Sequence, residues 1–93
     1  MSSTRYTINP RAVLQTMPDG SAVVLHLDTR FYFRLSETGT FLWQRLSASS
    51  GANPTALADS LLEAFDVERG QAELDAEQWL ATMVAEQLVL VES

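Results

Sequence analysis

Short apolar runs separated by turn residues make up the early part of the chain, a spacing typical of antiparallel strands. The runs lie at residues 12–16, 22–27 and 31–35 and are rich in β-branched, aliphatic and aromatic side chains. A Pro-Asp-Gly-Ser turn at 18–21 separates the first two, because Asp-Gly readily supplies the positive φ of a tight hairpin. A polar turn at 28–30 leads into the third run. The pattern predicts three antiparallel strands, preceded by a segment with only a weak apolar pattern.

The second part of the chain has the apolar spacing of amphipathic helices. A polar helix-start signal at 36–39 follows the third strand at once, and Asn53-Pro54 is typical of an N-cap with proline at the first helical position. After the last helix, residues 89–91 form a short apolar strand or an extended tail. The predicted helices cover residues 36–46, 54–65 and 71–87.

The element order β-β-β-α-α-α predicts a small α+β domain, with a three-stranded antiparallel sheet followed by three helices, as in a winged helix. Ninety-three residues suit one domain spanning 1–93, in which residues 1–4 are expected to be disordered. The core is expected to bury the main apolar side chains of the third strand and of the helices. These are Leu35, Leu42, Trp43, Leu46, Leu61, Phe65, Leu80 and Val84.

Alternation along the second strand places Val24 and His26 on one face and Val23 and Leu25 on the other. No second histidine, cysteine or paired acid lies near His26 in the sequence, so we expect a surface or edge residue without chemistry. The third strand is partly apolar on both faces. This suggests that the sheet is covered on one side and used for binding on the other.

The charge balance argues against nucleic acid as a partner. Twelve acidic residues stand against six arginines and no lysine, which gives a net charge of −6 at pH 7. Binding to phosphates requires clustered cations, and no part of the sequence gathers them. With 46% hydrophobic residues, no long apolar run and no signal-peptide pattern, the chain is expected to be a cytoplasmic protein without membrane contact.

Catalytic motifs are missing from the sequence. The chain has no cysteine and one histidine, and it contains no nucleophile–base pair, glycine-rich phosphate loop or metal-binding motif. The carboxylates are spread along polar helix faces. We therefore expect a non-enzyme without cofactor or metal, whose aromatic third strand, beside the long helix, can take up an extended peptide as a further strand.

Parts of the sequence resemble the PqqD-like family of small domains that bind the leaders of ribosomally made, post-translationally modified peptides. The resemblance is carried by Leu27-Asp28, by Tyr32, and by the segments Leu-Ser-Glu-Thr-Gly at 35–39 and Leu-Trp-Gln-Arg-Leu at 42–46. It implies that a leader peptide lies along the third strand and packs against the third helix. The expected peptide-binding residues are Phe31, Tyr32, Phe33, Arg34, Asp75, Ala76, Trp79 and Met83.

The sequence departs from the family pattern at identifiable positions. The family often has Asn where Ser36 stands and Gly where Gln87 stands, and the Pro-Glu that precedes the third strand in the pyrroloquinoline quinone pathway is absent. The chain looks more like the separate leader-binding protein of a lasso-peptide pathway, with a peptidase or another modifying enzyme as its partner. The alternatives are a winged-helix DNA-binding regulator, a PqqD-type chaperone for a radical enzyme, and an assembly or toxin–antitoxin partner. An exposed edge strand also allows a homodimer.

Overall fold

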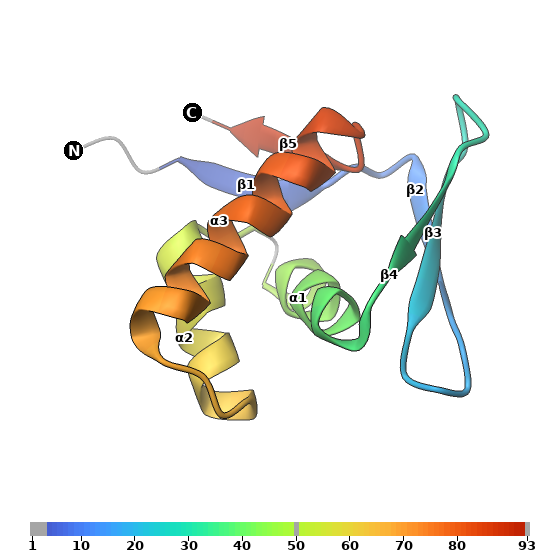
Figure 1. Ribbon diagram of the computed structural model, residues 1–93. Helices are drawn as coiled ribbons and strands as arrows, with labels where there is room; N and C mark the ends of the chain where they lie inside the picture. The colour runs from blue at the N-terminus through green and yellow to red at the C-terminus, as the bar shows by residue number, and fades with distance from the viewer. Residues whose placement is uncertain (1–3, 50, 93) are drawn as a thin grey trace.

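A computed structural model of the chain describes residues 4–49 and 51–92. The strands β2, β3 and β4 form an antiparallel sheet in that order, and three helices follow β4 (Figure 1). The predicted α+β fold is thereby confirmed. The bounds are β1 Arg5–Ile8, β2 Ala12–Thr16, β3 Ala22–His26, β4 Tyr32–Leu35, α1 Glu37–Ala48, α2 Pro54–Ala64, α3 Arg69–Ala85 and β5 Val89–Glu92.

A second, two-stranded sheet joins the two ends of the chain. β1 pairs antiparallel with β5, and Tyr6 also exchanges backbone hydrogen bonds with Ala52 at 2.8 and 3.0 Å. The sequence predicts β5 as one of two options but contains too weak a pattern to predict β1. Of the segment expected to be disordered, residues 1–3 lie outside the described residues, and Thr4 is partly buried.

α1 lies between the three-stranded sheet and the pair α2 and α3 (Figure 1), so it is packed on two sides. The buried core joins β3, β4 and all three helices. Leu35, Leu42, Trp43, Leu46, Leu61 and Leu80 are buried, as predicted from the apolar pattern.

Phe65 and Val84, the other two residues predicted for the core, are only partly buried. Phe65 lies at the C-cap of α2 and packs edge-on against Phe41, with ring centroids 5.3 Å apart. On α3 the buried face runs through Ala72, Ala76, Leu80 and Met83, which leaves Val84 at its margin.

The prediction that His26 is a surface or edge residue is wrong, since its side chain is only 3% exposed. The face of β3 that carries His26 and Val24 turns toward the helices. Its imidazole Nδ1 accepts hydrogen bonds from the backbone N–H groups of Asp28 (3.1 Å) and Thr29 (3.3 Å). The ring is thus tied to the turn that directly follows β3. Alternation places His26 and Val24 on one face, but it cannot reveal that this is the face that the fold buries.

The C-terminus of α3 closes in a Schellman motif. The backbone N–H of Leu88 donates to the Met83 carbonyl at 2.9 Å, and that of Gln87 donates to the Val84 carbonyl at 3.0 Å. This geometry requires a left-handed residue, and Gln87 has φ +62°. The motif aims the chain into β5 and so fixes the end of α3.

Replacing Gln87 by glycine should stabilise the protein by about 0.5–1 kcal/mol, because glycine adopts positive φ without the steric cost of a Cβ. The hydrogen bond that the Asn9 side chain donates to the Gln87 backbone carbonyl is retained in this variant. Urea unfolding of Gln87→Gly and wild type measures the gain. As a control, Glu86→Gly should lose stability, since Glu86 has φ −87°. Equal changes in both variants would contradict the argument.

Candidate functional site

β4 is an edge strand of the three-stranded sheet, and its backbone is unpaired on one side. The N–H of His26 donates to the Phe31 carbonyl at 2.9 Å. Hydrogen-bonded pairs alternate along an antiparallel ladder, so the next such pair is Phe33 with Val24. The backbone N–H and C=O groups of Tyr32 and Arg34 therefore point away from β3, toward the free edge.

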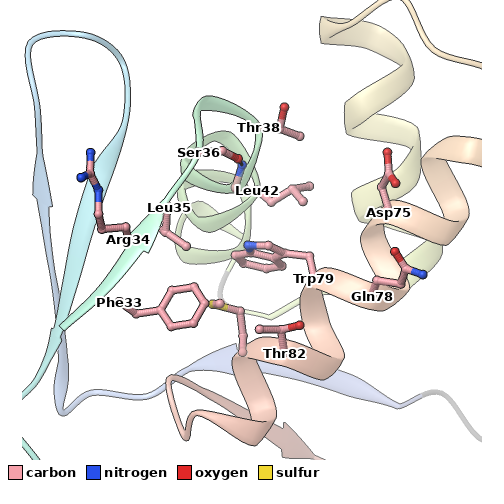
Figure 2. A pocket seen from close by; sticks show the side chains of 12 residues that line it. Phe33, Arg34, Leu35, Ser36, Thr38, Leu42, Asp75, Gln78, Trp79 and Thr82 are labelled. Carbon is pink, nitrogen blue, oxygen red and sulfur yellow. Dashed lines mark hydrogen bonds between the residues drawn. The ribbon is translucent and has the colours of Figure 1, made fainter. Parts of the chain in front are cut away.

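A cavity of about 390 Å³ lies beside this edge, between β4, the start of α1 and the inner face of α3. Figure 2 shows Phe33 and Trp79 directed into it from opposite walls, whereas Arg34 points away. The apolar part of the lining comes from Phe33, Leu35, Leu42, Trp79 and Met83. The polar part comes from Arg34, Ser36, Thr38, Asp75, Gln78 and Thr82, and the lining also includes the backbone of Gly39.

Of the residues predicted to bind peptide, the structure brings five to this cavity: Phe33, Arg34, Asp75, Trp79 and Met83. Phe31 and Tyr32 do not line it; they are 71% and 69% exposed on the edge and outer face of the sheet. Ala76 lies on the inner face of α3 and is fully buried in the core, so it does not line the cavity either.

Sequence reasoning did not assign the start of α1 to the site. Ser36, Thr38 and Gly39 all line the cavity, and the signal for them was the Leu-Ser-Glu-Thr-Gly segment itself. Its residues also serve the helix start, because the Ser36 hydroxyl accepts a hydrogen bond from the Gly39 N–H at 3.1 Å. On α3, Gln78 lies three residues after Asp75 and Thr82 lies three residues after Trp79, so both could have been found from these predicted residues by helical spacing.

Charged residues of opposite sign stand on the two sides of the cavity, with the Arg34 side chain directed away from it (Figure 2). Arg34 stands on β4, and Asp75 stands on α3, where its carboxylate accepts a hydrogen bond from the Gln71 side chain at 2.7 Å. The described parts of the chain hold no cluster of three or more histidine, cysteine, aspartate or glutamate side chains placed to bind a metal ion. What the site offers is backbone hydrogen bonding beside an apolar cavity with a charged rim.

None of the helices in residues 4–49 and 51–92 has the length and hydropathy needed to cross a membrane.

Two solved structures are similar to this chain over nearly its whole length. The first, described as TbiB1 in complex with the TbiA(beta) leader peptide, has 26% sequence identity and a TM-score of 0.80, covering 89% of this chain and 93% of that one. The second, lasso peptide synthetase B1 complexed with the leader peptide, shares the fold at 24% identity and a TM-score of 0.78, covering 91% and 96%. A comparison with curated protein sequences gave no match.

Residues 21–89 match the family described as coenzyme PQQ synthesis protein D (PqqD). The matched region begins just before β3 and ends at the first residue of β5, so it includes β4, the cavity and all three helices. The chain is therefore a member of the PqqD family.

Proposed function

We propose that this chain binds the leader of a ribosomally made precursor peptide by strand addition at β4 and presents it to a separate processing enzyme, without catalysing a reaction itself. The observation that carries the proposal is that the backbone N–H and C=O groups of Tyr32 and Arg34 point to the free edge of β4, beside the cavity between β4, α1 and α3. An added strand gains affinity from main-chain hydrogen bonds and selectivity from pockets that receive alternate side chains.

The alternation of the sheet indicates where the side chains of an added strand go. Phe33 and Leu35 face the helices, so a neighbouring peptide residue with the same orientation enters the cavity against Trp79 and Met83. The next peptide residue faces outward, in the row that contains Tyr32 and Leu25. A volume of about 390 Å³ with an apolar floor suits a large apolar leader side chain.

The comparisons support the class of ligand. Both similar structures contain a leader peptide, and the second is a lasso peptide synthetase component. On this basis we place the chain in a lasso-peptide pathway, with a peptidase or cyclase as the enzyme that receives the leader. The net charge of −6 argues against the DNA-binding alternative.

Replacing Trp79 by alanine should weaken leader binding by about 2 kcal/mol or more, as truncation of an aromatic hot spot does. The measurement is fluorescence polarisation with a labelled synthetic leader peptide, taken from a precursor gene identified next to the gene of this protein. Leu74→Ala is a matched control, because Leu74 is exposed on the same helix and does not line the cavity.

Melting temperatures of both variants separate a loss of binding from a loss of folding. A folded Trp79→Ala protein that binds the leader as tightly as wild type would exclude this cavity as the leader site.

A further inference from the structure

Gly39 lies in the first turn of α1, buried against the indole of Trp79. A Cβ added to Gly39 would come within 3.2 Å of Trp79 Nε1, 3.5 Å of Ser36 Oγ and 3.6 Å of Leu35 Cβ. The contact with the indole is closer than ordinary van der Waals packing, whereas the other two are normal. The missing side chain at position 39 therefore makes room for one group in particular, the Trp79 ring.

The Trp79 ring is held in this place by packing alone. Its Nε1–H is buried and finds no hydrogen-bond acceptor among the described residues. The side chain as a whole is only partly buried, since one side of the ring borders the cavity. A side chain added at Gly39 would therefore break no hydrogen bond of the Trp79 indole. The indole can move toward the open cavity.

We propose that Gly39 is a specificity-determining position: by letting the Trp79 indole lie against α1, it sets how large a leader side chain the cavity accepts. The proposal rests on the proposed function and extends it to a residue that does not itself offer a side chain to the peptide. A methyl group at position 39 displaces the indole by a few tenths of an ångström into the cavity. Larger side chains displace it further.

The test compares Gly39→Ala with Gly70→Ala. Both substitutions add one methyl group to a helical glycine, but a Cβ on Gly70 meets nothing within 4 Å. Gly39→Ala should raise the Kd of the labelled synthetic leader by about tenfold or more, as loss of one good contact does, and Gly70→Ala should leave it nearly unchanged. Neither variant should melt below wild type, because alanine favours the helix.

The indole ¹H–¹⁵N resonance of Trp79 reports on the position of the ring at the cavity, without any leader present. It should move in Gly39→Ala and stay in place in Gly70→Ala, with Trp79→Phe used to assign it against the resonance of Trp43. This readout holds even if the chain binds no leader, so failure of the proposed function and failure of the Gly39 proposal are distinguishable.

Trp79→Phe also shows whether the indole transmits the effect. In that background, which lacks the atom nearest to Gly39, the added methyl group should change leader affinity far less than in wild type. An equal loss in both backgrounds would mean that the methyl group acts directly, against the proposal. An unmoved resonance, an unchanged affinity, or a Gly39→Ala protein that fails to fold because the ring cannot yield would each overturn it.

Discussion

Replacing Trp43 by alanine should lower the free energy of unfolding by about 3–5 kcal/mol, the range for truncation of a buried aromatic side chain. Trp43 is 3% exposed and lies on α1, the helix packed between the sheet and the other helices (Figure 1). Its removal leaves a void between α1 and the strands that carry Ile8 and Leu14. A protein of this size has a total stability of only about 5–15 kcal/mol, so the variant should be close to unfolding at physiological temperature.

Urea titration of Trp43→Ala, followed by circular dichroism, measures the loss. Gln44→Ala is the matched control, because Gln44 is the next residue on α1 and is exposed. That variant should keep the wild-type midpoint. If Trp43→Ala also kept it, Trp43 would have to act as a surface anchor rather than as the centre of the core.

The second large effect is expected at the backbone of β4. Replacing Arg34 by proline should weaken leader binding by about 3 kcal/mol, since it removes one donor to the peptide and leaves a peptide carbonyl without a partner. The Arg34 N–H points to the free edge, so no hydrogen bond of the sheet is lost and the protein should stay folded. Proline at Phe33, whose N–H faces Val24, should instead disrupt the sheet.

Arg34→Ala provides the matched control for this experiment. It removes the same side chain but keeps the backbone donor, so it should cost much less, and the loss should depend on salt as expected for a charge at a wet rim. The difference in leader affinity between the two variants, measured by fluorescence polarisation, isolates the backbone contribution. Equal affinities in two folded variants would rule out strand addition at this edge.

The predictions from sequence that hold best are those whose cause lies within a few residues. Asn53 caps α2 by accepting a hydrogen bond from the Ala56 N–H at 2.8 Å, and Pro54 occupies the first turn, as the Asn-Pro pair predicts. Ser36 caps α1 in the same way. The turn at 18–21 is closed by hydrogen bonds from Ser21 to the Asp19 carboxylate, which hold the pKa of Asp19 below its ordinary value. Such local bonds form wherever the residue pattern occurs, so the pattern suffices to predict them.

The free edge of β4 and the cavity beside it depend on contacts between residues far apart in the chain. Alternation along β4 leaves open whether Phe33 or its neighbours present their N–H groups to the free edge, and only the pairing with β3 decides it. Likewise, the apolar pattern of α3 predicts an inward face, but only packing against α1 brings Trp79 over Gly39. β1 was missed because its partner, β5, lies at the other end of the chain, and His26 was misjudged because its burial depends on which face of β3 the rest of the fold covers. Periodicity identifies the elements of this protein, and their docking decides which atoms meet at the edge of β4.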